Sequence, residues 1–179
     1  MAIVFELVIN YGRNRAAAEN ACQVISAHPP LAAGPHHVQL HEPMTSTVHD
    51  AAGQPYIEIS VVPVQVGFRV AMDGRRPRLE LTAAELSELG SGLYSLLATL
   101  TGYRAARVGW DPEAFVDPME LRQEWAEEIA EGALPGLVLA EDLRLDVPTH
   151  GFVPFADGFI WIPYEGERPS SLTADTGRP

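Results

Sequence analysis

Residues 82–100 read TAAELSELGSGLYSLLATL, and the spacing in this stretch predicts an amphipathic helix. Thr82 and Glu85 have the spacing of a capping box, in which the two side chains bond to backbone N–H groups at a helix start. Gly90 falls within the apolar stripe, where a missing side chain allows close packing on a sheet. Six leucines recur at helical spacing and define the face that we expect to be buried: Leu86, Leu89, Leu93, Leu96, Leu97 and Leu100.

The segments on either side of this helix alternate between strand and helix patterns. Residues 3–10 are apolar and rich in β-branched types, whereas residues 13–28 are rich in alanine and favour a helix. Three more β-prone stretches cover residues 36–42, 56–72 and 103–110. The resulting order, β-α-β-β-α-β, predicts an α+β fold with a ferredoxin-like core, in which two helices cover one face of a mostly antiparallel sheet. Many unrelated functions use this fold, so it predicts no chemistry.

The chain beyond residue 110 reads as an addition to this core. It holds a glutamate-rich helix and then a hairpin whose strands flank Ala156-Asp157-Gly158, and Asp-Gly is a strong turn signal. We therefore predict three parts. These are an α+β core (1–110), an acidic helix and aromatic hairpin packed on it (111–168), and a disordered tail (169–179).

Composition narrows the classes of partner. The 179 residues carry a net charge of −12, which disfavours nonspecific binding to nucleic acid or to an anionic membrane. Cys22 is the only cysteine, which excludes an intramolecular disulfide and a thiolate cluster for zinc. The N-terminal run reads as a strand rather than a signal peptide, because Glu6 interrupts it and no basic residue precedes it. No stretch has the ~18 uninterrupted apolar residues of a membrane span, so we expect a cytoplasmic protein.

The negative charge is concentrated in the C-terminal third. Residues 1–109 contain 8 arginines and 9 acidic residues, whereas residues 110–168 contain 3 arginines and 14 acidic residues. Asp117 and Gly132 have the positions of an N-cap and a C-terminal stop around a glutamate-rich helix. Five glutamates share an arc of that helix only ~100° wide: Glu120, Glu124, Glu127, Glu128 and Glu131.

This arrangement costs helix stability. Like charges four residues apart are unfavourable by roughly 0.2–0.5 kcal/mol per pair, and the helix C-terminus prefers cations. Two interpretations remain open. The glutamates form either a solvated face that keeps the protein in solution or a patch that attracts a basic partner.

The hairpin is rich in aromatic residues. Residues 152–164 hold five of them, and both faces of the second strand are apolar. These aromatics serve either a core or a surface for a partner or a second copy, with Trp161 and Tyr164 as anchors and Glu165 and Glu167 as an acidic rim.

The histidine and cysteine patterns do not support a metal site or a catalytic nucleophile. On a strand, His37 and His41 would lie ~13 Å apart, too far to share one ion, so His36, His37 and His41 predict no metal site. Cys22 reads as a small buried residue rather than a nucleophile. No phosphate-binding loop is present, and we predict neither a metal nor another cofactor.

One carboxylate group stays open as a candidate for acid–base chemistry. Asp111, Glu113, Asp117 and Glu120 occur in GWDPE and DPME, with His150 downstream. Asp-Pro is also a routine signal for a turn or a helix start, and nothing in the sequence fixes the geometry that catalysis needs.

The leading hypothesis is a binding protein without enzymatic activity that engages a basic protein, in the physical style of immunity proteins and inhibitors. The enzyme class stays open, in the form of a ferredoxin-like domain that binds a small ligand between its sheet and the C-terminal segment. A structural subunit that forms a homodimer through the hairpin is a further alternative. The predicted partner-binding residues are Glu120, Glu124, Glu127, Glu128, Glu131, Trp161, Tyr164, Glu165 and Glu167.

Overall fold

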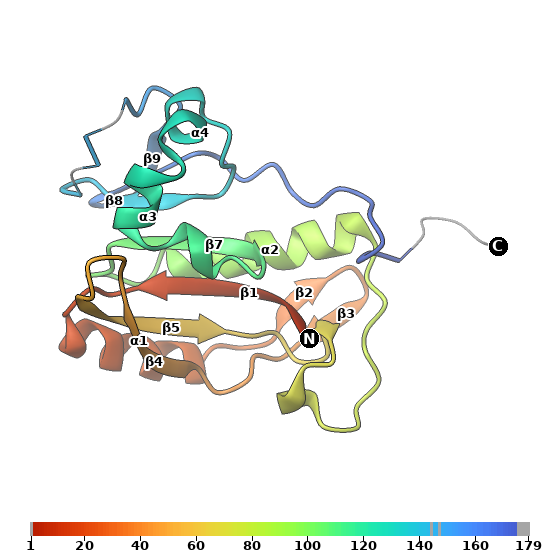
Figure 1. Cartoon of the computed structure of the whole chain (residues 1–179). Coiled ribbons are helices and arrows are strands. Elements are labelled where there is room, and N and C mark those ends of the chain that lie inside the picture. The colour runs from red at the N-terminus through yellow and green to blue at the C-terminus, as the bar shows by residue number, and fades with distance from the viewer. Residues whose placement is uncertain (1, 144, 147, 175–179) are drawn as a thin grey trace.

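The structure is a computed structural model that describes residues 2–143, 145–146 and 148–174 (Figure 1). These residues form a mixed α+β fold with a mainly antiparallel sheet. The strands are β1 (Ile3–Asn10), β2 (Leu31–Ala33), β3 (His36–Val38), β4 (Met44–His49), β5 (Pro55–Val61), β6 (Gly67–Phe68), β7 (Ala105–Trp110), β8 (Val138–Ala140), β9 (Val153–Ala156) and β10 (Phe159–Trp161). The helices are α1 (Arg15–Ser26), α2 (Ala83–Leu97), α3 (Pro118–Gln123) and α4 (Ala126–Glu131), with short 3-10 turns η1 (Ala71–Asp73) and η2 (Glu113–Phe115).

The main sheet has eight strands in the order β4-β5-β1-β7-β8-β10-β9, and β6 pairs with the start of β1. Every strand pairing in the described sheet is antiparallel. Strands β2 and β3 form a separate two-stranded hairpin. The C-terminal strands β8, β9 and β10 therefore extend the same sheet that the N-terminal strands begin, at the end of the molecule where α3 and α4 lie (Figure 1).

Helices α1 and α2 bury one side of this sheet. The alternation of a β-strand places Phe5, Leu7 and Ile9 of β1 on one side, where they join the main hydrophobic core. Helix α2 begins at the predicted capping box, since Thr82 and Glu85 satisfy each other's backbone groups. The six predicted leucines are all buried in the same core, the last of them just beyond the end of α2: Leu86, Leu89, Leu93, Leu96, Leu97 and Leu100.

Segments that follow β7 cover part of the opposite side. Val8 of β1 belongs to a second core, together with Leu121 of α3 and Ile129 of α4. Asn10 holds this cover to the sheet, because its side-chain Nδ2 donates to the carbonyl of Val116 at 2.9 Å. The sheet is thus packed from both sides.

The structure differs from the predicted elements at several places: β2 and β8 were not predicted, and the stretch 56–72 divides into β5 and β6. The strand expected at 36–42 shortens to β3 and lies outside the main sheet, while the unpredicted β4 takes the position beside β5. The single acidic helix divides into α3 and α4 near Trp125, whose backbone leaves helical geometry (φ −118°, ψ 17°). The predicted helix start at Asp117 and stop at Gly132 are both present.

The C-terminal segment returns to the core. The amide of Ala174 donates to the carbonyl of Leu81 at 2.7 Å, just before α2. The predicted disordered tail covers 169–179, and its residues 175–179 lie outside the described part of the chain. Among the residues that the structure describes, no helix is both long and apolar enough to cross a membrane.

Candidate functional site

Carboxylates from two neighbouring strands lie on the side of the sheet opposite α1 and α2. Glu6 of β1 alternates with the core residues Phe5 and Leu7, and its residue is 3% exposed. Glu58 of β5 stands across from Asn10 and is 8% exposed. The hydroxyl of Ser60 donates to Glu6 Oε2. Burying two carboxylates without a cation is costly, so their position calls for an explanation.

The turn after β7 adds two more carboxylates to Glu6. Asp111 is fixed to β1, because its amide donates to the Val4 carbonyl at 2.9 Å and its Oδ1 accepts from the Val4 amide at 2.8 Å. Glu113 begins η2, the next short turn. Carboxylate oxygens of Glu6, Asp111 and Glu113 all lie within 4.8 Å of one another. Oxygen ligands of this kind suit hard cations, and the same charges attract an ammonium or guanidinium group.

Burial and mutual repulsion change the acidity of the two buried glutamates. Burial raises the pKa of Glu6 to about 7, against the hydrogen bond from Ser60, and the charges of Glu113, Asp111 and Glu58 add to the rise. Burial likewise raises the pKa of Glu58 to about 7, again with Glu113 contributing. Both groups therefore hold a substantial fraction of protons near neutral pH.

The row of carboxylates continues onto α3. Burial raises the pKa of Glu120, and the charges of Asp117 and Glu124 raise it further. The charges of Glu58, Asp117 and Glu120 also act together on the hydroxyl of Tyr56, whose pKa rises mainly because it is buried. We call this set of carboxylates the acidic face, and it comprises Glu6, Glu58, Asp111, Glu113, Asp117, Glu120 and Glu124, of which Glu6, Glu58 and Asp117 are buried.

Within the part of the chain that the structure describes, no pair of oppositely charged side chains in contact includes a carboxylate of the acidic face. The ion pairs there join His41 to Asp73, Arg104 to Asp142, Arg122 to Asp146 and Arg168 to Glu165. Two arginines that belong to nearby elements are engaged elsewhere. The Arg107 guanidinium lies 4.1 Å from the centre of the Phe115 ring, and Arg122 Nε donates to the Leu145 carbonyl at 3.1 Å.

The glutamates predicted to bind a partner lie on the same side of the sheet as the acidic face. Glu120 and Glu124 belong to α3 and its C-cap, and they are part of that face. The other three lie on α4, whose buried Ile129 belongs to the second core: Glu127, Glu128 and Glu131. Of the five, Glu120 and Glu128 are half-buried and the others are exposed.

The predicted aromatic anchors lie on the other side of the sheet. Trp161 and Tyr164 pack on Tyr94 of α2, with ring centres 5.3 Å and 5.1 Å from it. Glu167 accepts a hydrogen bond from the Tyr164 hydroxyl at 2.9 Å, and Glu165 lies 3.6 Å from Arg168. The structure therefore does not bring Trp161 and Tyr164 together with the glutamates of α3 and α4.

One hollow of about 320 Å³ lies between the sheet and α3 and is lined by Arg104, Asp117 and Arg122 among others, and a smaller one lies beside these aromatics. The smaller hollow has a volume of about 240 Å³ between α2 and the β9–β10 hairpin. Its two serines, Ser91 and Ser95, donate their hydroxyls to carbonyls of their own helix at 2.9 Å and 3.0 Å. No charged side chain lines the smaller hollow, so it offers little to fix or activate a substrate.

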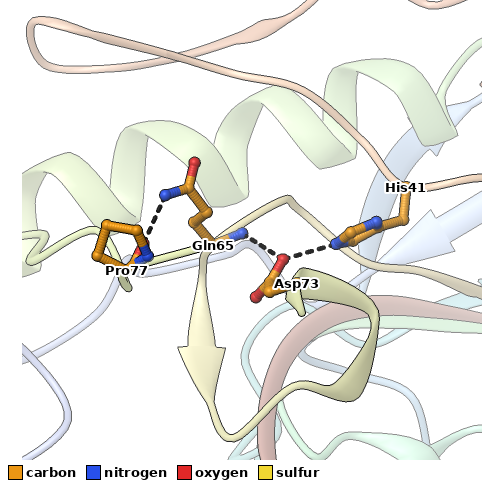
Figure 2. Close-up of polar contacts among 4 residues, drawn as sticks. All are labelled: His41, Gln65, Asp73 and Pro77. Carbon is orange, nitrogen blue, oxygen red and sulfur yellow. Dashed lines mark hydrogen bonds and ion pairs between the residues drawn. The ribbon is translucent and has the colours of Figure 1, made fainter. Parts of the chain in front are cut away.

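A histidine–aspartate pair forms a second polar cluster (Figure 2). His41 Nε2 lies 2.7 Å from Asp73 Oδ1, which also accepts from the Gln65 amide at 2.8 Å. Gln65 in turn donates its side-chain Nε2 to the carbonyl of Pro77. Among the described residues, no hydroxyl or thiol bonds to His41, so this cluster joins three loop segments rather than activating a nucleophile.

The remaining histidine and cysteine candidates do not converge. His36 and His37 lie on the separate hairpin strand β3, whereas His41 faces Asp73. Cys22 of α1 is half-buried, with its Sγ 3.5 Å from the Thr45 hydroxyl. These positions and contacts place none of the three histidines, nor Cys22, in a catalytic environment.

Comparison with known proteins adds no family. No protein-family model matches the chain, and neither a curated protein nor a solved structure does. The residues and their geometry are therefore the whole basis for inferring a function.

Sequence reasoning missed the two buried carboxylates at the centre of the acidic face. Glu6 stands inside IVFELVIN, and Glu58 alternates with Ile57 and Ile59 in YIEISV. A single carboxylate within each of two apolar strands was the available signal. The pattern alone does not say that the two strands are neighbours and that both glutamates face the same side.

Proposed function

We propose that this protein is a non-enzymatic binding protein whose acidic face engages a basic region of another protein. The observation that carries the proposal is that carboxylate oxygens of Glu6, Asp111 and Glu113 lie within 4.8 Å of one another and that no ion pair among the described residues includes a carboxylate of the acidic face. A partner's lysine or arginine would supply the missing charge and remove the repulsion between Glu6, Glu58 and Glu113. Such a complementary field steers association and favours one partner orientation.

Several finer assignments belong to the same proposal. The order β4-β5-β1-β7, with α1 and α2 on one side, supports a ferredoxin-like core that β8, β9 and β10 extend. We place the protein in the cytoplasm, with residues 111–168 as an appended region. An immunity-type or inhibitor-type role is the special case in which the basic partner is a toxin or an enzyme. The proposed contact surface retains Glu120 and Glu124 and moves from the aromatic hairpin to the sheet.

The test compares two charge-matched triple variants of the full chain. The acidic-face variant carries Glu113→Gln, Glu120→Gln and Glu124→Gln, and the control carries Glu19→Gln, Glu80→Gln and Glu141→Gln. Each immobilised protein is exposed to an extract of the cells that produce it, and captured proteins are then purified and titrated. The titrations run from about 50 mM to about 500 mM salt, over which the Debye length shortens about threefold.

We expect a basic partner whose affinity falls steeply with salt. The acidic-face variant should bind it at least about tenfold more weakly, since three favourable charges are lost. The control should stay within about twofold of the wild type. Equal losses in both variants, an acidic partner, or binding that ignores salt would each overturn the proposal.

A further inference from the structure

Strand β4 is an exposed edge of the main sheet. It pairs only with β5, and its six residues keep one uninterrupted register from Met44 opposite Ser60 to His49 opposite Pro55. Its sequence, MTSTVH, contains no proline and no acidic, lysine or arginine side chain. Five of the six residues are exposed, and Val48 is half-buried. Figure 1 shows β4 at the outer margin of the sheet. An unprotected neutral edge of this kind can accept another strand.

Three residues of β4 direct their backbone N–H and C=O groups toward the open edge of the sheet. The amide of Asp50 donates to the carbonyl of Gln54 at 3.0 Å, which continues the β4–β5 register into the connecting turn. In an antiparallel pair, residues that bond across the pair alternate with residues that do not. The even-numbered residues of β4 therefore bond to β5. The N–H and C=O groups of Thr45, Thr47 and His49 point away from it, toward the open edge.

The opposite edge of the same sheet lacks this capacity. Strand β9 has four residues, and Pro154 removes one amide from it. Its pairing with β10 shifts register between Phe159 and Ile160, which bends the ladder. Short length, proline and a register shift are the usual protections of an edge strand, so β4 is the open end of the sheet.

The acidic face lies next to β4 on one side of the sheet. Met44, Ser46 and Val48 stand opposite Ser60, Glu58 and Tyr56, so their side chains share the side that carries Glu58. A strand added beside β4 would lie about 10 Å from β5, at two strand spacings. A lysine or arginine on that side of the added strand could extend over the small Ser46 side chain toward Glu58.

We propose that β4 is the docking strand for the basic partner. An extended segment of that partner adds to the sheet beside β4, and its lysine or arginine side chains at alternate positions face Glu58 and the rest of the acidic face. This proposal rests on the proposed function and specifies its binding mode. Main-chain bonds at Thr45, Thr47 and His49 supply affinity, and the carboxylates select the alternating basic pattern.

A second copy of the chain fits this edge less well. Two β4 strands could pair, but β4 has no lysine or arginine to place near Glu58 of the other copy. Each copy would also carry a net charge of −12 into the contact. Charge complementarity therefore favours a basic segment as the occupant, and self-association becomes an outcome that the test must detect.

The test uses the full chain and a synthetic peptide in which lysine and valine alternate, with blocked ends. Two control peptides isolate the two contributions. One replaces each lysine by glutamate, and the other replaces each valine by proline, which removes amides from the ladder but keeps the charge. Affinity is measured by fluorescence anisotropy at low salt. Amide hydrogen exchange then reports which backbone groups become protected.

Matched variants separate the backbone from the side chain at the edge. Thr47→Pro removes one outward amide, whereas Thr47→Val keeps it and changes only the side chain. Ser46→Lys places a cation beside Glu58, whereas Ser46→Asn does not. We expect Thr47→Pro and Ser46→Lys each to lower the affinity for the lysine–valine peptide about tenfold. The affinities of the two control variants should stay within about twofold of the wild type. Peptide binding should protect the amides of Thr45, Thr47 and His49 and leave those of Ser46 and Val48 unchanged.

The outcomes distinguish this inference from the proposed function. The proline peptide could bind as well as the valine peptide while the triple variant at Glu113, Glu120 and Glu124 binds both peptides weakly. In that case β4 is not the docking strand, and the proposed binding to the acidic face still holds. If the triple variant binds the peptide like wild type, the proposed function fails. If Thr47→Pro unfolds by circular dichroism, Ser46→Lys and the peptide pair decide the question. A dimer in sedimentation that Ser46→Lys dissociates would overturn the inference.

Discussion

The two sides of the sheet are built from the same strands but serve different ends. On one side, Phe5, Leu7 and Ile9 meet α1 and α2 in an apolar core. On the other side, Glu6 alternates with these residues and meets three further carboxylates. The first side gains stability from apolar burial, whereas the second side combines a smaller hydrophobic core with buried carboxylates, whose burial is costly. Buried carboxylates with raised pKa values are common at functional sites.

The largest expected effect tests the side of the sheet that α1 and α2 cover. Phe5→Ala should lower the unfolding free energy by about 3–5 kcal/mol, because it leaves a cavity beneath α2. Phe5 is 0% exposed and also contacts Trp110 edge-to-face, with ring centres 5.3 Å apart. Urea denaturation followed by far-ultraviolet circular dichroism measures the loss. A cost below about 1 kcal/mol would mean that this side is not the main source of stability.

The second prediction concerns the adjacent residue on the other side. The pKa of Glu6 and of Glu58 rises from 4.5 to about 7 in the folded protein, so the native state holds protons that the unfolded chain has released. The contribution of these two groups to the unfolding free energy should therefore be most favourable below about pH 4.5. It should fall by on the order of 2 kcal/mol as pH rises through about 7. Urea denaturation across this pH range measures the slope.

A glutamine pair gives the control for this pH dependence. The double variant Glu6→Gln and Glu58→Gln removes both titrations and should flatten the fall between pH 4.5 and about 7. The exposed pair Glu80→Gln and Glu141→Gln should leave it unchanged. An equal slope in wild type and in the Glu6→Gln, Glu58→Gln variant would mean that burial does not raise the pKa of these two carboxylates.

The elements of the side that α1 and α2 cover could be read from the sequence because each signal was local. The capping box at Thr82 and Glu85, the leucine stripe of α2 and the Asp157-Gly158 turn all act within a few residues. The unpredicted β4 had no such signal, since MTSTVH is polar and becomes a strand through its pairing with β5. Tertiary contacts decide strands of this kind.

The acidic face was only half predictable for a related reason. Charge counting located Glu120 and Glu124, because clustered glutamates are visible along one helix. It did not find Glu6, Glu58 and Glu113 together, because their proximity depends on the pairing of β1 with β5 and on the turn after β7. The sequence also could not show that Trp161 and Tyr164 pack on α2, on the side of the sheet opposite α3 and α4. Alternation gives two faces but does not say which helix covers each.

The smallest expected effect compares one helix cap from each side of the sheet. Thr82→Ala should cost about 1 kcal/mol, since it removes the acceptor for the Glu85 amide at the start of α2. Asp117→Asn keeps an acceptor for the Met119 amide at the start of α3 but takes one charge from the acidic face. The weaker helix-dipole interaction and the relieved repulsion oppose each other, so this change should be neutral within about 0.5 kcal/mol. Urea denaturation at low salt measures both. If Asp117→Asn costs as much as Thr82→Ala, the charge of Asp117 stabilises its surroundings, and the acidic face does not extend through that residue.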